Sequence, residues 1–288
     1  HVKVILTGEG ADEVFLGYIS FQPGKGMHFD QILNKLKEKK APKRLQAGPI
    51  VEALGFVPLP DYVDTLSPRV QIFLLRFFAR KNRPRHLARH PLQQLKERID
   101  RHQTEGRPLV RKMQYAWIKN ILAPYILTIL GDRAELGHSV EGRTPFLDHH
   151  LFEAVRHVPD RFKIHDGVEK YVLREAFKDR VTEAIYIRKK WPFSAPPLWI
   201  EKGRYSGLDE LLKKYLSREA VLKSGIFSYQ RIRVWQWLTK RFSYDSLFRR
   251  KINTVLLLIL TVQILDHLFI QDFEGNLKRT APPTATAP

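Results

Sequence analysis

Three carboxylates stand within five residues near the start of the chain, at Glu9, Asp12 and Glu13. Gly8 and Gly10 flank Glu9, and glycines at such places let a substrate approach the backbone closely. In one interpretation, Asp12 and Glu13 complement the positive end of a helix dipole, an effect of about 0.3–1 kcal/mol. In the other, Asp12 is an oxygen ligand for Mg²⁺. The residue types alone leave both interpretations open.

A second segment, residues 131–148, is dense in groups that form ion pairs. Asp132 or Glu141 could pair with Arg133 or Arg143 through two parallel hydrogen bonds and brace a long loop against the core. Taken alone, the residues favour this structural role over a role in binding.

Two groups of cations follow. Lys170 and Arg174 lie four residues apart in a segment, residues 167–178, whose pattern predicts a helix with both cations on its polar face. Arg188 and Lys189 begin a short basic segment. Phosphate oxygens are the natural partners of such side chains, and a solvated surface is the structural alternative.

These groups need elements to position them. We expect a strand over residues 2–6, a glycine turn, and a helix that begins at Ala11. In α/β proteins ligands commonly bind where a strand ends, so the three carboxylates would lie in a suitable place. Pro124 is expected to kink or interrupt one of the later helices. Further helices are predicted over residues 29–40, 68–81, 93–102, 109–131 and 145–158, and residues 208–273 are predicted to be mostly helical.

The composition limits the classes of protein that remain. The 288 residues are 43% hydrophobic, which suits a globular protein of one large or two small domains. The absence of cysteine excludes disulfides, thiolate metal sites and cysteine nucleophiles within these residues. The net charge is +19, and residues 76–112 hold 12 Lys and Arg against 3 Asp and Glu. Because no nucleic-acid-binding motif accompanies this run, we interpret it as a solvated helix face and predict no nucleic-acid partner.

The longest apolar stretch, residues 252–270, approaches the length of a membrane span. Polar residues such as Gln263 and Asp266 interrupt it, so we predict a buried helix and no membrane partner. The predicted inner face consists of Leu256, Leu257, Leu260, Ile264 and Leu268. The chain begins at His1 without the regions of a signal peptide, which we interpret as an internal start.

Three motifs, taken together, occur in an order typical of one family. The chain resembles the glutamine-hydrolysing asparagine synthetases over most of residues 1–273. The joint occurrence outweighs the structural interpretation that each segment supports alone. The motifs are Thr7-Gly8-Glu9-Gly10-Ala11-Asp12-Glu13, then Asp132-Arg133 with Glu141-Gly142-Arg143-Thr144-Pro145-Phe146-Leu147-Asp148, then Lys170-Tyr171-Val172-Leu173-Arg174-Glu175, and residues 188–196 (RKKWPFSAP) strengthen the likeness.

The resemblance implies an α/β synthetase domain of the ATP-pyrophosphatase (HUP-like) type, here mainly its helical C-terminal part with few strands. Residues 1–279 would form this portion, and residues 280–288 a disordered tail. Family members also carry a glutaminase domain and an SGGxDS phosphate loop, and neither motif occurs in these residues. The resemblance therefore implies an upstream half as partner and an incomplete isolated chain. It also implies a cytoplasmic location and is compatible with a homodimer.

The activity implied by the resemblance is ATP-dependent amide formation on aspartate, with ammonia from glutamine as the nitrogen source. The products are asparagine, AMP and pyrophosphate, formed through β-aspartyl-AMP, and the cofactors are ATP and Mg²⁺. Glu9 would accept the proton from ammonia, Lys170 would contact the reacting phosphate, and Asp12 would bind Mg²⁺ with pyrophosphate. The remaining positions implied to bind or shape the nucleotide and aspartate pocket are Gly8, Gly10, Asp132, Arg133, Glu141, Arg143 and Lys189.

Two departures from the family pattern leave alternatives open. Leu16 stands where a glycine is common, and Glu135-Leu136-Gly137 replaces the more usual Ser-Met-Ala. A related ligase that acts on another carboxylate, or a non-catalytic binding protein with the same fold, are the alternatives.

Overall fold

A computed structural model of the chain describes residues 2–21, 47–60, 73–82, 90–189, 206–239, 241 and 247–275. The chain divides into two compact units. The first comprises His1–Val70 and Arg89–Pro192, and the second comprises Gln71–Ala88 and Phe193–Pro288. The predicted helix over residues 29–40, most of the RKKWPFSAP segment and the predicted tail lie outside the described residues.

The described strands all lie in the first unit and form two small sheets. β1 (Val4–Leu6) pairs in parallel with β2 (Glu141–Arg143), while β3 (Ile164–His165) and β4 (Val168–Glu169) form an antiparallel hairpin. The rest of the described chain is mostly helical, so the prediction of a helical portion with few strands is confirmed.

β1 is an exposed strand. Its three side chains alternate in direction, yet all are exposed, as is the preceding Val2. β2 occupies one edge of β1, and no other described strand pairs with the opposite edge. Parallel strands are usually covered on both faces, so this pair has the character of a fragment of a larger sheet.

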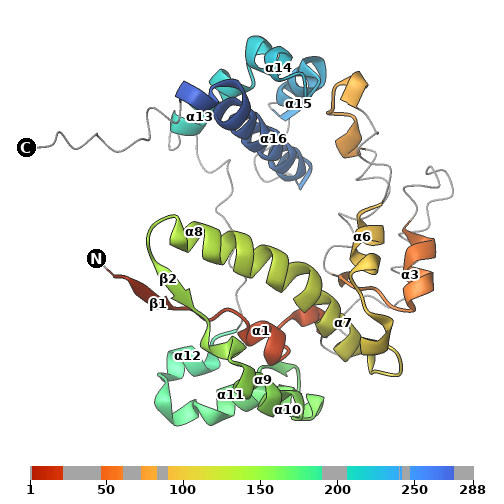
Figure 1. Cartoon of the computed structure of the whole chain (residues 1–288), viewed down its shortest axis with the longest axis vertical. Helices are drawn as coiled ribbons and strands as arrows, with labels where there is room; N and C mark the ends of the chain where they lie inside the picture. Colours follow the sequence, from red (N-terminus) through yellow and green to blue (C-terminus); the bar gives the residue numbers. More distant parts are fainter. Residues whose placement is uncertain are drawn as a thin grey trace, which may run out of the picture. The chain divides into compact units, whose positions relative to one another are not determined.

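One long helical rod crosses the first unit beside β2. It consists of α7 (Leu109–Trp117), η6 (Ile118–Asp132) and α8 (Arg133–Leu136), which continue into one another (Figure 1). η6 is π-helical and contains Pro124. A proline lacks the N–H of a normal helical turn and crowds the preceding one, and π turns are one way in which a helix absorbs such a defect. Pro124 therefore alters the helix without interrupting it.

Two helices follow β2, and the second of them begins at a side-chain cap. Pro145 lies in the first turn of η7 (Pro145–Leu147), and α9 (His149–Arg156) follows. Oδ1 of Asp148 accepts hydrogen bonds from the backbone N–H groups of His150 and Leu151, at 2.9 and 3.1 Å. The predicted single helix over residues 145–158 is therefore two helices, because the extended backbone of Asp148 starts a new one.

Short helices complete the first unit and enclose its core. The helix predicted from Ala11 is present as α1 (Ala11–Val14), and the buried side chains nearby include Leu16, Phe21, Phe56 and Trp117. The other helices are η1 (Ile19–Phe21), α3 (Gly48–Leu54), α6 (Pro91–Glu97), η5 (Arg101–Gln103), α10 (Asp160–Lys163), α11 (Tyr171–Ala176), η8 (Lys178–Arg180) and α12 (Glu183–Ile187).

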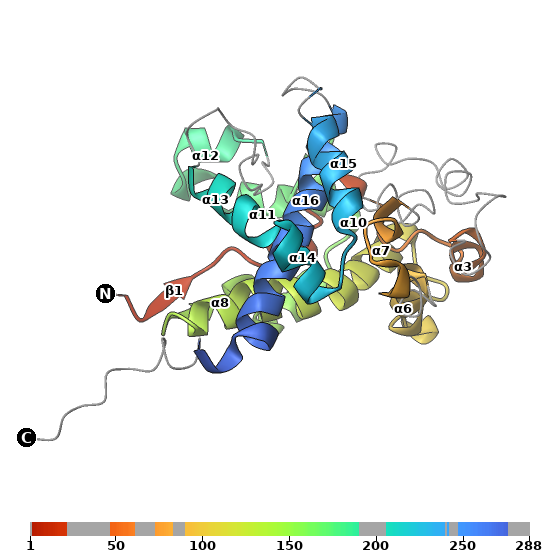
Figure 2. The ribbon, with the colours of Figure 1, turned by 90° about the horizontal axis from the view of Figure 1, so that it is seen from above.

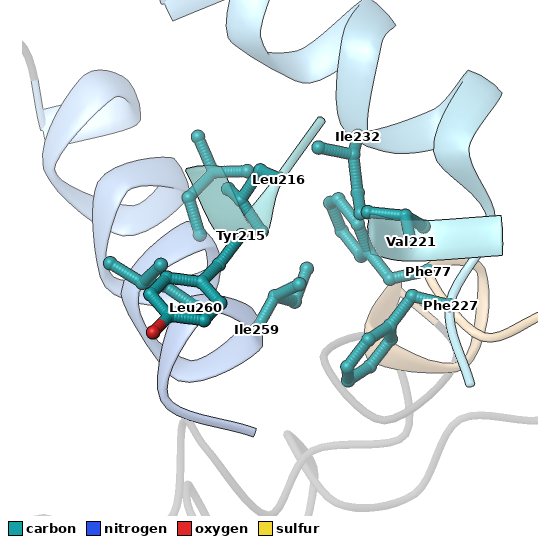
Figure 3. Close-up of a cluster of buried hydrophobic side chains, with 9 residues drawn as sticks. Phe77, Tyr215, Leu216, Val221, Phe227, Ile232, Ile259 and Leu260 are labelled. Carbon is teal, nitrogen blue, oxygen red and sulfur yellow. The ribbon is translucent and has the colours of Figure 1, made fainter. Parts of the chain in front are cut away.

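The second unit is a group of helices around α16 (Leu247–Asp266) (Figure 2). α13 (Ser206–Tyr215), α14 (Arg218–Ser224) and α15 (Tyr229–Thr239) pack on it, and η9 (His267–Gln271) extends it. Figure 3 shows the buried cluster that these helices share with Phe77. In the described part of the predicted helix over residues 68–81, residues 73–75 are helical. The helix ends before Phe78, which forms a β-bridge with Phe227, and η4 (Arg80–Asn82) follows.

α16 buries one face and exposes the other. Leu256 and Leu260 of the predicted inner face are buried, and Leu257 and Ile264 pack against the same cluster. The part from Asn253 to Gln271 is long and apolar enough to cross a membrane by length and composition. The apolar side chains exposed on this part and directly after it are Leu258, Leu265, Phe269, Ile270 and Phe273.

Lys163, at the end of α10, is a buried cation in the first unit. Its side chain is 0% exposed, and its Nζ atom has no hydrogen-bond partner. Burial and the nearby Arg111 guanidinium lower the pKa of Lys163 to about 8, although Asp160 opposes the shift. Arg111 itself pairs with Asp160 at 2.7 Å.

We predict that Lys163→Met stabilises the fold at neutral pH by about 1–3 kcal/mol, because it removes a buried charge without a hydrogen-bond partner. Below pH 8 the lysine is charged in both the folded and the unfolded state, so the penalty is fully present. The penalty should vanish between pH 8 and pH 10.5, where only the unfolded state still binds the proton. Urea unfolding of wild type, Lys163→Met and the exposed control Lys119→Met across this range measures the difference. A constant difference at all pH values would contradict the prediction.

Candidate active site

The structure brings Asp12 and Lys170 into direct contact. Nζ of Lys170 donates a hydrogen bond to Oδ1 of Asp12 at 2.6 Å, although the two residues lie 158 positions apart. The Lys170 and Asp12 side chains are 20% and 25% exposed, so this ion pair is accessible from solvent. Lys170, predicted to contact the reacting phosphate, and Asp12, predicted to bind Mg²⁺ with pyrophosphate, therefore lie side by side.

Glycines make room for the loop that carries Asp12. Gly10 has a φ of +88°, and a Cβ atom there would lie 2.2 Å from a methyl carbon of Leu147. A Cβ atom on Gly17 would lie 2.0 Å from Oδ1 of Asp12 and 2.9 Å from its Cα. Gly8, by contrast, has open space where a Cβ would stand. Gly10 and Gly17 are thus required by packing, whereas Gly8 leaves room for a ligand.

Leu16, which stands where the family commonly has glycine, has a left-handed backbone with a φ of +58°. A non-glycine residue pays about 1–2 kcal/mol for this conformation. The side chain is fully buried in the core of the first unit, which offsets that cost. The loop therefore keeps the backbone shape that glycine would favour.

Glu13 anchors the same loop from inside. It is buried, and its Oε1 accepts hydrogen bonds from the Tyr18 hydroxyl at 2.6 Å and from Nε1 of Trp117 at 3.2 Å. Gln114 donates to the Glu13 backbone carbonyl at 2.6 Å. Burial raises the pKa of Glu13, and burial together with the Glu13 charge raises the pKa of Tyr18.

The sequence interpretation missed this role of Glu13. It treated the residue as a partner of the helix dipole, whereas the carboxylate is hydrogen-bonded in the core between α1 and α7. The apolar residues that follow it, Val14 to Leu16, are a signal that could have indicated burial, because a short helix here must face the core.

Glu9 lies in the turn just after β1 and is exposed. The backbone N–H of Thr7 donates to the carbonyl of Arg143 at 2.9 Å, which extends the pairing of β1 with β2. Glu9 therefore follows the carboxyl end of a parallel pair, the edge at which α/β sheets bind ligands.

The ion pairs of the second motif differ from the prediction. Nε of Arg143 donates to Oε1 of Glu141 at 2.8 Å, and both side chains are more than half exposed. The two residues stand two apart on one strand, so they face the same side and meet each other. The Arg143 partner lowers the pKa of Glu141.

Asp132 and Arg133 are exposed at the junction of η6 and α8. Within the described part of the chain, no hydrogen bond or ion pair joins them to Glu141 or Arg143. The prediction of bidentate pairs that brace a loop against the core is therefore wrong. All four side chains of this motif face solvent.

Lys170 precedes its helix instead of lying on a helix face. The predicted helix over residues 167–178 begins only at Tyr171, and Lys170 has a left-handed backbone with a φ of +55°. Asp166 and Gly167, with φ of +48° and +78°, form the turn of the β3–β4 hairpin. An Asp-Gly pair is a strong hairpin signal, so the sequence contained the evidence for this correction.

The described residues fit a metal that is held mainly by its substrate. No group of three His, Cys, Asp or Glu side chains that could hold a metal occurs among the described residues. Mg²⁺ commonly binds through one or two carboxylates together with phosphates and water. Asp12 suits that mode. Lys189 is exposed after α12, and Lys190 and the residues that follow it lie outside the described part.

Comparison with known proteins identifies the class. The model of a family described as Asparagine synthase matches residues 1–264, so the chain belongs to the asparagine synthase family. "Asparagine synthetase [glutamine-hydrolyzing] 1" of Bacillus subtilis is 31% identical over 206 residues, which cover 68% of this chain and 31% of that protein. "Amidase chry2" of Gibberella zeae is 26% identical over 300 residues, which cover 91% of this chain and 40% of that protein.

A third relative matches over a shorter length. "Asparagine synthetase [glutamine-hydrolyzing] 3" of Bacillus subtilis is 44% identical over 88 residues, or 31% of this chain and 14% of that protein. The chain thus spans less than half of the length of these relatives. No solved structure matches the chain.

We predict that Gly17→Ala displaces Asp12 and lowers the free energy of unfolding by about 1–3 kcal/mol, because the new methyl group would clash with backbone as well as side chain. Gly8→Ala is the matched control, since its methyl group meets nothing within 4 Å. Thermal unfolding of both variants provides the measurement. Equal stability of the two would show that Asp12 does not occupy the space beside Gly17.

Proposed function

We propose that this chain is part of an asparagine synthetase that forms the amide of aspartate at the expense of ATP. The observation that carries the proposal is the Asp12–Lys170 contact of 2.6 Å, beside the carboxyl edge of the β1–β2 pair. An anionic and a cationic side chain are thus available together for a cation and for phosphate oxygens. Membership of the asparagine synthase family supports the assignment.

In the first half-reaction, a side-chain carboxylate oxygen of aspartate attacks the α-phosphorus of ATP, and the bond to pyrophosphate breaks. Negative charge grows on the phosphate oxygens as this happens. Lys170 stabilises that charge with an ammonium group that is already directed by Asp12. Lys189 adds a second cation for the phosphates. When bound at Asp12, Mg²⁺ would neutralise charge on the pyrophosphate.

In the second half-reaction, ammonia attacks the carbonyl carbon of β-aspartyl-AMP, and AMP leaves. The attacking nitrogen must lose a proton, and Glu9 is an exposed carboxylate at the strand end that can accept it. Gly8 and Gly10 flank Glu9 and leave the loop backbone accessible on the Gly8 side.

The second motif is proposed to line the aspartate and nucleotide pocket. The exposure of Asp132, Arg133, Glu141 and Arg143 supports this, because buried structural pairs would leave no groups for a substrate. Glu141 and Arg143 also lie on β2, beside the strand that leads to Glu9.

An upstream half is proposed to complete the enzyme. It would carry the phosphate loop and extend the HUP-like sheet from the open edge of β1, where the apolar side chains Val4, Ile5 and Leu6 are exposed. A glutaminase in the same half would supply ammonia. A cytoplasmic location and a homodimer are further expectations for this enzyme, again from the family.

A related ligase that acts on another carboxylate is the second candidate. The match to "Amidase chry2", which extends over 91% of this chain, favours it. Glu135 supports the same alternative, because its carboxylate lies directly against Gly142 in the second motif. The two candidates share the adenylation chemistry and differ in the carboxylate that enters.

Aspartate-dependent exchange of pyrophosphate into ATP, together with amide formation from ammonia, tests the proposal in the full-length protein. Asparagine formation with aspartate supports it. Exchange with a different carboxylate and not with aspartate supports the second candidate. Absence of exchange with any carboxylate would overturn both.

We predict that Lys170→Ala in the full-length protein lowers the rate of pyrophosphate exchange by at least about 100-fold to 1,000-fold, because a charge-stabilising donor is lost. The substitution adds no backbone strain, since Lys170 already bears a left-handed conformation as a non-glycine residue. Lys119→Ala, on an exposed position, is the control. If the folded Lys170→Ala variant shows near-normal pyrophosphate exchange, Lys170 does not act on the reacting phosphate.

We predict that Glu9→Gln separates the half-reactions. The amide keeps the size of Glu9 but cannot accept a proton, so exchange should survive while asparagine formation falls. Asp12→Asn should instead impair exchange and raise the Mg²⁺ concentration that is needed, because a charged oxygen ligand is lost. Equal losses in both assays for Glu9→Gln would refute the role assigned to Glu9.

A further inference from the structure

Arg174 of α11 has every N–H group of its guanidinium occupied. Nε donates to the carbonyl of Glu169 at 3.0 Å, and Nη1 donates to the carbonyls of Tyr186 and Arg188 at 2.7 and 3.2 Å. Nη2 donates to the carbonyl of Arg188 and to the Glu169 carboxylate, both at 3.1 Å. A guanidinium has five N–H donors, so none remains for a substrate.

The bonded carbonyls belong to two separate segments of chain. Glu169 ends β4 and immediately precedes Lys170. Arg188 follows α12 and immediately precedes Lys189. One guanidinium therefore fixes the backbone next to both lysines that the proposed function assigns to phosphate. The Arg174 and Glu169 side chains are 18% and 14% exposed, and the bonds to the Arg188 carbonyl lie at an exposed position.

α11 and α12 are joined by a second contact. The Tyr186 hydroxyl donates to the Glu175 carboxylate at 2.5 Å, which ties α12 to α11 one residue beyond Arg174. Arg174 donates three hydrogen bonds to the carbonyls of Tyr186 and Arg188, whereas Tyr186 and Glu175 share one. Arg174 is therefore the principal connection between α11 and the backbone before Lys189.

We propose that Arg174 is a positioning residue that sets the placement of Lys189 relative to Lys170, and thereby the geometry with which the chain binds pyrophosphate oxygens. The inference rests on the proposed function for the identity of the phosphate ligand. Arg174 does not touch the substrate, because its donors are used within the protein. It acts through the two backbone segments that carry the lysines.

A lysine cannot replace Arg174 in this role. Its single nitrogen has three donors without a planar arrangement, so it cannot reach the carbonyl groups of Glu169, Tyr186 and Arg188 and the Glu169 carboxylate together. Arg174→Lys keeps the positive charge but loses most of the hydrogen bonds that join the Glu169 and Arg188 segments. This one substitution therefore separates the effect of the charge at residue 174 from its effect on the positions of Lys170 and Lys189.

The test measures the affinity for inorganic pyrophosphate by calorimetry in a double-mutant cycle of the full-length protein. The cycle contains wild type, Arg174→Lys, Lys189→Ala and the double variant, with Arg180→Lys as an exposed control. We expect Arg174→Lys to weaken binding about tenfold in wild type and less than threefold when Lys189 is already absent. Arg180→Lys should leave the affinity unchanged.

Equal losses in the two backgrounds would overturn the proposal, because they indicate a general structural effect. If Arg174→Lys does not fold, Glu169→Gln takes its place in the cycle, because it weakens the ion pair between Arg174 and residue 169. Pyrophosphate binding with the expected coupling, but without aspartate-dependent exchange, would leave the positioning role intact and refute only the proposed reaction. A wild-type protein that binds no pyrophosphate would refute both.

Discussion

The contact between Asp12 and Lys170 requires that two parts of the chain 158 positions apart meet. One part is the turn after β1 and the other is the turn before α11, and both carry residues in left-handed conformations. Such conformations persist only where the surrounding structure enforces them. Much of the first unit can be understood as the means of enforcing these two turns.

Each turn is fixed by a polar group whose hydrogen bonds are made within the protein. The Glu13 carboxylate joins the Asp12 loop to Tyr18 and Trp117, and the Arg174 guanidinium joins the Lys170 turn to the segment before Lys189. Apolar packing alone tolerates sliding, because it has little directional preference. Hydrogen bonds of fixed geometry remove that freedom, so the backbone on both sides of the Asp12–Lys170 contact is held in place.

Local signals in the sequence predicted the local structure well. The β-branched run, the glycine turn and the proline at residue 145 correctly indicated β1, α1 and the start of η7. The family motifs placed Asp12 and Lys170 in one site, which periodicity could not do across 158 positions. The missed features depend on tertiary context. The buried state of Glu13 follows from Trp117, and the exposure of the Glu141–Arg143 pair follows from the strand that contains both residues. The hairpin before Lys170 was the exception, because its Asp-Gly turn was visible in the sequence.

The edge of β1 that no other described strand covers has a consequence for handling the chain by itself. Its backbone N–H and C=O groups on the side away from β2 are flanked by Val4 and Leu6, both exposed. An apolar strand edge of this kind accepts any extended segment, including the same strand of another copy. Preparations that contain only these residues would therefore tend to self-associate as concentration rises, even at a net charge of +19, since neighbouring positive charges are screened within about 10 Å at 0.1 M salt. The strand that leads into the turn of Glu9 and Asp12 is thus also the strand that promotes self-association when its second edge is uncovered.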